Sequence, residues 1–123
     1  MATRRRFRVP AVAAADGTGT FYTPYLSGAI ESIHYIKTDY ADTVDFTITA
    51  DVTGQTIWTE ANVTAAKVCK PRAATHSNAG VAITYDGTRA VNDLIVLASD
   101  RVKIVLAQAG VSTTGLFYIV VTE

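Results

Sequence analysis

Three things are scarce in this sequence: cysteine, net charge and long apolar runs. Cys69 is the only cysteine among 123 residues, so no internal disulfide holds the fold together. No stretch approaches the roughly 18–20 apolar residues of a membrane helix. The apolar stretch after the N-terminal arginines is interrupted by Arg8 and Pro10, which does not fit a secretory leader. We therefore expect a protein that matures in a reducing compartment and does not cross a membrane.

Apolar side chains, by contrast, are plentiful. Hydrophobic residues make up 49% of the chain, which is enough for one core and argues against disorder. A chain of this length suits one folded domain, which we place at residues 11–123.

Alternation of apolar and polar residues predicts strands along most of the chain. From Val44 to Asp51, apolar residues at even positions alternate with polar residues at odd ones, as a half-buried strand requires. Similar patterns predict strands at residues 31–37, 56–60, 81–85, 94–98, 101–107 and 116–122, and extended segments at residues 5–13 and 20–24. Turn-forming residues 39–42 and 99–100 predict two antiparallel hairpins, which join 31–37 to 44–51 and 94–98 to 101–107.

The segment between the predicted strands leaves one ambiguity. Residues 61–70 fit a helical turn and an extended segment equally well, and Pro71 ends either one. We expect a loop at residues 72–80. No segment is a convincing crossover helix, which a parallel sheet would need. The predicted fold is therefore all-β: an antiparallel β-sandwich, jelly-roll-like, with an extended N-terminal arm.

Positive charge is concentrated at the N-terminus, in the predicted arm of residues 1–10. Arg4, Arg5, Arg6 and Arg8 surround Phe7, and they leave seven of the eleven basic residues for the rest of the chain, against eleven acidic ones. We predict that these five side chains bind a partner through phosphate, carboxylates or an acidic protein surface. The alternative is a solvated terminus. Contact with nucleic acid is expected only through this arm.

The search for catalytic or metal-binding chemistry finds no site. His34, His76 and Cys69 are the imidazole and thiol candidates, and no two have the spacing of a zinc site. Carboxylate pairs occur in turns and strands, where structural roles account for them. No Gly-x-Ser-x-Gly elbow and no dinucleotide-binding glycine motif is present. We therefore predict no enzyme activity, no metal and no cofactor.

Two groups of side chains could still meet a ligand or a partner. A strand face with few charges could be buried against another protein, although threonine is equally a good strand residue. Its members are Thr47, Thr49, Thr53, Thr56 and Thr59. Four aromatic residues could stack on sugars, which makes a carbohydrate-binding β-sandwich an alternative of another class. They are Tyr22, Tyr25, Tyr40 and Trp58.

Three segments after Ala50 carry a further pattern and together span about half of the chain. They are Thr-Gly-Gln-Thr-Ile-Trp-Thr at 53–59, Lys-Pro-Arg-Ala-Ala-Thr-His at 70–76 leading to Gly80, and Asp-Arg-Val-Lys-Ile-Val-Leu-Ala-Gln-Ala-Gly at 100–110 with Thr-Gly-Leu-Phe-Tyr-Ile at 114–119. In these segments the chain resembles small virion structural proteins of tailed bacteriophages, in particular head-decoration (cement) proteins.

The resemblance implies a non-enzymatic virion protein, made in the host cytoplasm, that binds between major capsid subunits and stabilises the phage head. It also implies a homo-oligomer, a trimer or a dimer, whose arm lies along a neighbouring subunit or adds a strand to its sheet edge. A head–tail connector, tail or fibre component is the alternative within the virion.

Overall fold

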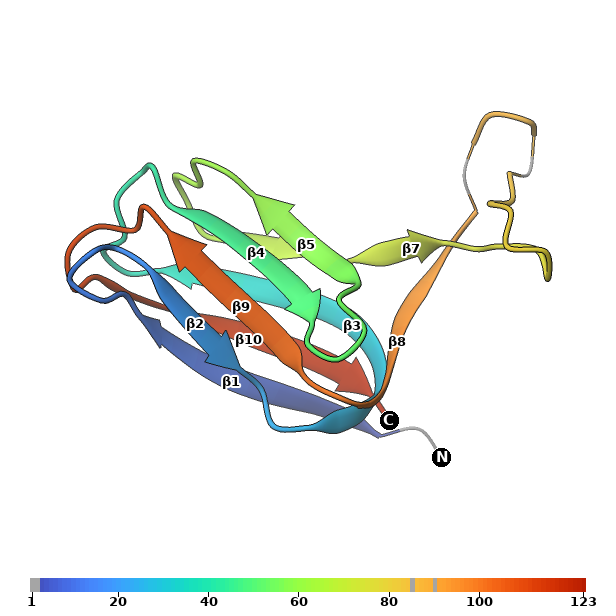
Figure 1. Ribbon diagram of the computed structural model, residues 1–123, viewed down its shortest axis with the longest axis horizontal. Helices are drawn as coiled ribbons and strands as arrows, with labels where there is room; N and C mark the ends of the chain where they lie inside the picture. The colour runs from blue at the N-terminus through green and yellow to red at the C-terminus, as the bar shows by residue number, and fades with distance from the viewer. Residues whose placement is uncertain (1–2, 85, 90) are drawn as a thin grey trace.

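The chain folds into antiparallel β-sheets (Figure 1). The computed structural model describes residues 3–84, 86–89 and 91–123, and these ranges contain ten strands and no helix. Strands make up 58% of the described residues, so the predicted all-β, antiparallel class is confirmed.

Sheet A has six strands and includes the first and the last strand. Its order is β1 (Arg4–Val12), β10 (Thr114–Thr122), β3 (Leu26–Lys37), β8 (Asn92–Asp100) and β7 (Arg72–Ala74), and β6 (Lys67–Cys69) also pairs with β3. Because β10 pairs with β1 on one side and β3 on the other, it is a central strand of this sheet.

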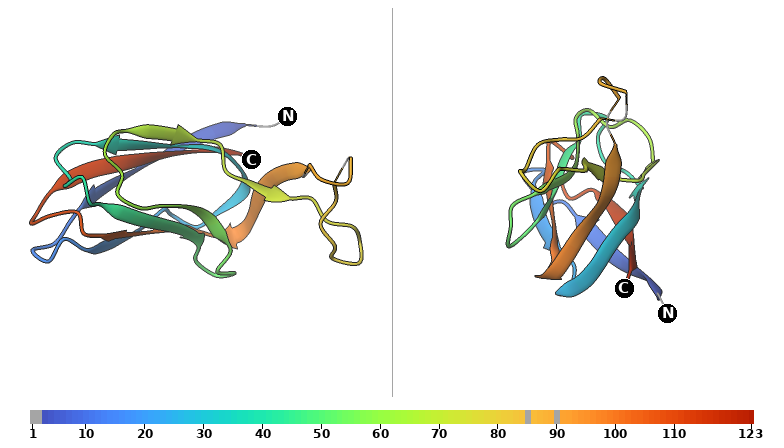
Figure 2. Two further views of the ribbon diagram at one scale, coloured as in Figure 1. Left: turned by 90° about the horizontal axis from the view of Figure 1, so that it is seen from above. Right: turned by 90° about the vertical axis from the view of Figure 1, so that its right-hand side faces the viewer.

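Sheet B has four strands and faces sheet A. Its order is β2 (Gly19–Tyr22), β9 (Val102–Ala107), β4 (Asp45–Ala50) and β5 (Thr56–Glu60). Seen from above, the two sheets form two layers (Figure 2). Buried residues of both layers belong to one hydrophobic cluster, so the two sheets share a core.

Aromatic rings join the two layers at the centre of this core. The Phe46 ring of β4 packs edge-on against that of Phe117 in β10, with centroids 5.4 Å apart, and against Trp58 of β5 at 4.8 Å. The Tyr35 ring of β3 lies 5.0 Å from Phe46 and 5.2 Å from Phe117. Such ring pairs each add about 0.5–1.5 kcal/mol beyond the burial of their area. The contacts of Phe46 with Phe117 and with Tyr35 cross between the layers and therefore hold sheet A against sheet B.

Both predicted hairpins are wrong, because the chain changes sheets at each of the two turns. β3 and β8 lie in sheet A, whereas β4 and β9, which follow them, lie in sheet B. Residues 38–44 form the first corner and bury Tyr40 and Val44. The second corner is shorter: β8 ends at Asp100 and β9 begins at Val102. A corner and a hairpin leave the same local alternation, so the pattern alone did not separate them.

Tyr40 fixes the first corner. Its ring lies over Gly115 of β10, where an added methyl carbon would come within 2.7 Å of the ring atom Cζ. Its hydroxyl donates a hydrogen bond to the backbone carbonyl of Ala11 in β1. Glycine at position 115 therefore leaves the room that the tyrosine ring occupies.

Asp100 fixes the second corner. Its carboxylate is buried and accepts hydrogen bonds from the backbone amides of Val52, at 2.8 Å, and Arg101, at 2.7 Å. Burial raises the pKa of Asp100, but the backbone amides that bind it lower the pKa further, so the net pKa lies below its ordinary value. The carboxylate thus ties the β8–β9 corner to the β4–β5 turn.

The predicted N-terminal arm is not confirmed as a separate element. Its extended conformation is present, but residues 4–12 are β1, which pairs with β10 from Arg4 opposite Thr122 to Val12 opposite Thr114. Phe7 is buried with the other odd-numbered residues up to Ala13, because alternate side chains of this strand face the core. The boundary expected at residue 10 therefore falls inside a strand. Residues 1–2 of the predicted arm lie outside the described residues.

A ribbon formed by residues 72–84, 86–89 and 91–94 projects beyond the rest of the two sheets (Figures 1 and 2). β7 pairs with the start of β8, from Arg72 opposite Leu94 to Ala74 opposite Asn92. The predicted loop at residues 72–80 thus begins with a strand. Of the strand predicted at residues 81–85, Ala82 and Thr84 form isolated bridges, that of Ala82 with His76, and residue 85 lies outside the described residues. Residues 61–70 are extended or irregular, with β6 at 67–69.

Candidate interaction surface

The outer face of sheet A carries apolar side chains where a solvent-facing strand usually carries polar ones. Odd-numbered residues of β10 are buried in the core, so the even-numbered residues point outward. Three of these are large and half-buried: Leu116, Tyr118 and Val120. An antiparallel sheet with one face in water normally alternates apolar and polar side chains, and β10 does not.

The register of sheet A places neighbours on both sides of these three residues. The rows, read from β1 through β10 to β3, are Pro10–Leu116–Ile36, Arg8–Tyr118–His34 and Arg6–Val120–Ser32. We call these nine residues the A-face. On the β3 side the surface continues onto Val68 of β6, which is 63% exposed, and Val96 of β8, which is 67% exposed. The A-face is therefore apolar along its centre and basic along its β1 edge.

Three of the five predicted partner-binding residues lie on this side of the sheet. The guanidinium of Arg6 lies over the Tyr118 ring, 4.4 Å from its centroid. Arg8 is exposed beside the same ring. Arg4 forms an ion pair with Glu31 of β3, at 2.6 Å, and its hydrogen bond lowers the pKa of that carboxyl group. Alternation along β1 brings these three arginines together.

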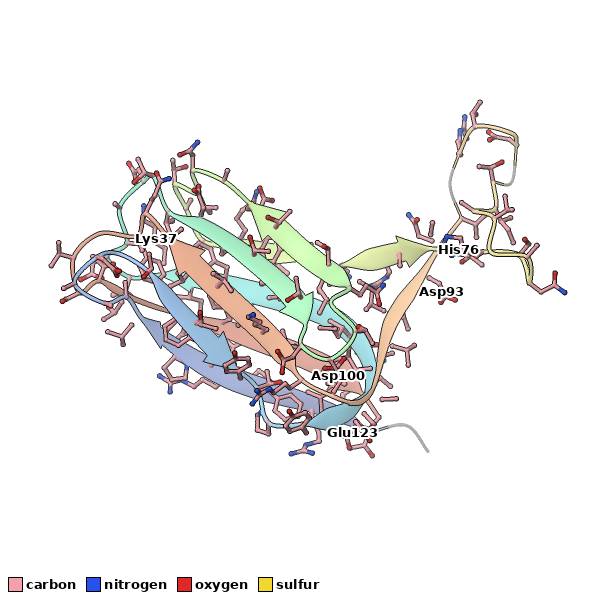
Figure 3. The ribbon with its side chains drawn as sticks, viewed as in Figure 1. Lys37, His76, Asp93, Asp100 and Glu123 are labelled. Carbon is pink, nitrogen blue, oxygen red and sulfur yellow. The ribbon has the colours of Figure 1, made fainter. Side chains whose placement is uncertain are left out.

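The other two predicted residues are placed differently. Phe7 is a core residue with 9% of its surface exposed. Arg5 pairs with Glu123 at 3.0 Å, near the chain end labelled in Figure 3, and its guanidinium lies 4.9 Å from the Phe7 ring centroid. The pleat of β1 therefore decides which residues of the predicted segment lie on the A-face.

The outer face of sheet B has a different, polar character. Thr47 and Thr59 lie opposite each other on β4 and β5, with hydroxyl oxygens 3.4 Å apart, and Thr49 lies opposite Thr56. Thr53 lies in the turn between these strands. Four of the five threonines considered above therefore share one face. The contrast with this face singles out the A-face as the candidate interaction surface.

The aromatic residues considered for sugar binding do not form one platform. Tyr40 and Trp58 are core residues, 3% and 9% exposed. Tyr22 and Tyr25 are exposed, but both flank Arg101, whose guanidinium lies 3.9 Å and 4.9 Å from their ring centroids. Two of the four rings are therefore covered by the protein itself.

The imidazole and thiol candidates lie on separate surfaces. His34 points outward on the A-face, whereas Cys69 lies opposite the core residue Ile33, on the other side of the sheet. His76 is on the projecting ribbon (Figure 3). Burial, followed by the charge of Glu60, raises the pKa of the Cys69 thiol. Within the described ranges, no group of three or more His, Cys, Asp or Glu side chains is placed to hold a metal ion.

The apolar residues of the A-face were missed at the sequence level, although a signal was present. Residues 116–121 read Leu-Phe-Tyr-Ile-Val-Val, six apolar or aromatic residues in succession. A strand with one wet face alternates, whereas an unbroken apolar run is typical of a strand covered on both faces.

Comparison with known proteins adds no relative: neither a protein-family model nor a curated protein sequence matches the chain. In the part of the chain that the structure describes, no helix has the length and apolar character needed to span a membrane. The candidate surface therefore stands on the geometry alone.

Proposed function

We propose that this protein is a structural virion protein that binds between major capsid subunits and stabilises the phage head, as a decoration or cement protein. The observation that carries the proposal is the A-face, a half-exposed apolar strip with arginines along one side. Apolar patches of this kind mark contact surfaces between proteins. Tyrosine and arginine, which meet here as Tyr118 and Arg6, are enriched among the residues that dominate binding energy.

The resemblance of three sequence segments to phage decoration proteins supports the virion as the setting. In this proposal the fold is an antiparallel β-sandwich with jelly-roll-like connections. The shared core of the two sheets and the two corners at which the chain changes sheets support this description. The protein would act as a homo-oligomer, a trimer or a dimer, in contact with the major capsid protein.

The arrangement of the A-face suits a cementing role. Its centre, around Leu116 and Val120, carries no charge, so another protein can cover it without burying unpaired ions. Arg6 and Arg8 at its edge would orient it toward an acidic surface, since rim charges govern encounter and register more than affinity.

The test compares two valine-to-aspartate variants that alter opposite faces. Val120 lies in the centre of the A-face, and Val105 lies at the equivalent depth on the outer face of sheet B; both are half-buried residues of central strands. Heads that lack the protein are incubated with each variant, and occupancy is measured by electron cryomicroscopy. We expect Val120→Asp to weaken binding by about tenfold or more, because the contact would then have to desolvate a carboxylate at its apolar centre, and that carboxylate would compete with the partner for Arg6 opposite it. Val105→Asp should bind as the unaltered protein does.

Two results would count against the proposal. Equal occupancy by both variants would remove the A-face from the contact. Density confined to one vertex, or to the tail or fibres, would replace the decoration role with that of a connector, tail or fibre component.

A further inference from the structure

β1 is the outer strand of sheet A, and one side of its backbone faces away from the sheet. Thr3 and Glu123 exchange both of their backbone hydrogen bonds, and the Ala13 amide donates to the Thr113 carbonyl at 2.8 Å. Directly opposed residues of an antiparallel pair alternate between bonded and non-bonded, so the odd-numbered residues of β1 bond to β10. The even-numbered residues direct their amides and carbonyls outward: Arg4, Arg6, Arg8, Pro10 and Val12.

Pro10 shows where this free edge ends. Proline has no amide proton, and it occupies an outward-facing position, where no bond to β10 is lost. The outward-facing donors before it are the amides of Arg4, Arg6 and Arg8. Among residues 3–84, 86–89 and 91–123, no strand pairs with this side of β1. The edge is therefore a template for one more strand.

The side chains of the same residues determine which strand fits. Arg4 is neutralised by Glu31, but Arg6 and Arg8 form no ion pair within the described residues. Two uncompensated positive charges thus lie two residues apart along the edge, a spacing of about 7 Å. The intervening Phe7 points to the core side.

We infer that the free edge of β1 binds an extended segment of a partner protein in which acidic side chains alternate with apolar ones. A strand added to an edge brings facing Cβ atoms to about 4.5–5.5 Å, so acidic side chains would lie opposite Arg6 and Arg8. The intervening side chains would fall level with Phe7 and Val9 at the rim of the core, where apolar groups are favoured.

A second copy of β1 does not fit this edge. Antiparallel self-pairing centred on Arg6 would set Arg6 against Arg6 and Arg4 against Arg8, and like charges directly opposite one another are destabilising. The edge therefore selects a partner of opposite charge. This inference rests on the proposed function for the existence of a partner, and on β1 alone for the chemistry of that partner.

The probe for the experiment is a nine-residue peptide, blocked at both ends, that alternates valine and aspartate. One control peptide alternates valine and lysine. A second carries proline in place of the central valine, which keeps the charge but removes a donor and disfavours the strand. Each is titrated into ¹⁵N-labelled protein, and amide exchange is followed residue by residue. The acidic peptide should slow exchange of the Arg4, Arg6 and Arg8 amides by about tenfold or more, as new backbone hydrogen bonds protect them.

Two protein variants with the same charge change test the side-chain part. Arg8→Glu should weaken binding of the acidic peptide by about tenfold, because it converts an attractive cross-strand pair into a repulsive one. Lys103→Glu, on the outer face of sheet B, should change it by less than about twofold, since exposed charges beyond a Debye length are largely screened. Circular dichroism confirms that both variants are folded.

The absence of saturable binding at millimolar peptide would overturn the inference. So would protection of amides outside β1, or binding of the lysine or proline peptide as tight as that of the acidic one. An equal loss of peptide binding in the Arg8→Glu and Lys103→Glu variants would also overturn it. Any of these, together with loss of head binding in Val120→Asp, would leave the proposed function standing. If the acidic peptide bound to β1 but the protein were absent from virions, the inference would stand and the proposed function would fail.

Discussion

Removing the hydroxyl group from either of two stacked core tyrosines should change the stability of the protein, and the two changes should have opposite signs. The rings of Tyr35 and Tyr40 are nearly parallel, with centroids 6.1 Å apart, and both residues are buried. The Tyr40 hydroxyl donates to the Ala11 carbonyl, whereas the Tyr35 hydroxyl has no hydrogen-bond partner among the described residues. Replacing tyrosine with phenylalanine therefore removes a hydrogen bond at one position and an unpaired buried group at the other.

The expected magnitudes follow from the net value of a hydrogen bond and the cost of leaving a buried group without one. Tyr40→Phe should lower the free energy of unfolding by about 1–2 kcal/mol, because a hydrogen bond is lost and a carbonyl is left with less than its full set of partners. Tyr35→Phe should raise it by about 1 kcal/mol, because the ring packing is kept and a desolvated hydroxyl is removed. The two variants should thus differ by about 2–3 kcal/mol.

Urea unfolding followed by tryptophan fluorescence measures both effects. Trp58 is the only tryptophan, and its ring packs against Phe46 in the core, so its emission reports the exposure of the core on unfolding. The midpoints should move in opposite directions at a constant slope, which indicates that the surface exposed on unfolding is unchanged. If Tyr35→Phe lowered stability as much as Tyr40→Phe, the unpaired state of the Tyr35 hydroxyl would be refuted.

Stability should fall as the pH rises above about 10, the ordinary pKa of tyrosine, because burial raises the pKa of Tyr35 to about 12 and that of Tyr40 as well. The stabilisation by the two neutral hydroxyls is complete below that pH and is lost as the pH approaches the folded-state pKa values. Urea titrations at a series of pH values measure this loss, and the double phenylalanine variant should lose less stability over the same pH range. Gly115→Ala should cost about 2–4 kcal/mol, because the new methyl meets the Tyr40 ring. In Gly54→Ala nothing lies within 4 Å of the new carbon, so this variant should lose only about 1–2 kcal/mol of stability, from the strain of alanine at a positive φ. Equal thermal midpoints for the two glycine variants would contradict the packing argument. Asp100→Ala should cost about 2 kcal/mol through its lost amide contacts. Because the folded-state pKa of Asp100 is lowered, its contribution is present above about pH 4 and is lost only as the pH falls through that lower value; the variant's stability should therefore converge with that of the unaltered protein in acid.

Alternation predicted most of the strands because each has one face in the core. It failed at the corners, where the outcome depends on contacts with residues far away in the sequence. The first corner is stabilised by the packing of Tyr40 on Gly115, and the second by the hydrogen bond that Asp100 accepts from the amide of Val52. Neither contact leaves a local pattern, so a turn that changes sheets looked the same as a hairpin.

Only part of the candidate surface could be predicted from the sequence, for a similar reason. Charge density identified the basic N-terminal segment, but not that it pairs with a strand more than a hundred residues later. Once that pairing is made, the pleat separates Arg6 and Arg8 from Phe7, and it places them beside Tyr118. A long-range pairing therefore converts a predicted arm into the edge of a composite face.

The central place of β10 in sheet A also determines when the protein can fold. Arg4 and Thr122, paired in the sheet, are 118 positions apart, so β1 has no partner until the last described strand has been synthesised. One side of β3 also lacks its pairing partner until β10 has been synthesised. Closing such long loops is entropically costly, and chains dominated by distant contacts fold slowly. A nascent chain that has not yet reached residue 114 would leave the apolar side of β1 uncovered, which makes the ribosome-bound stage the one at which this protein is most exposed to aggregation.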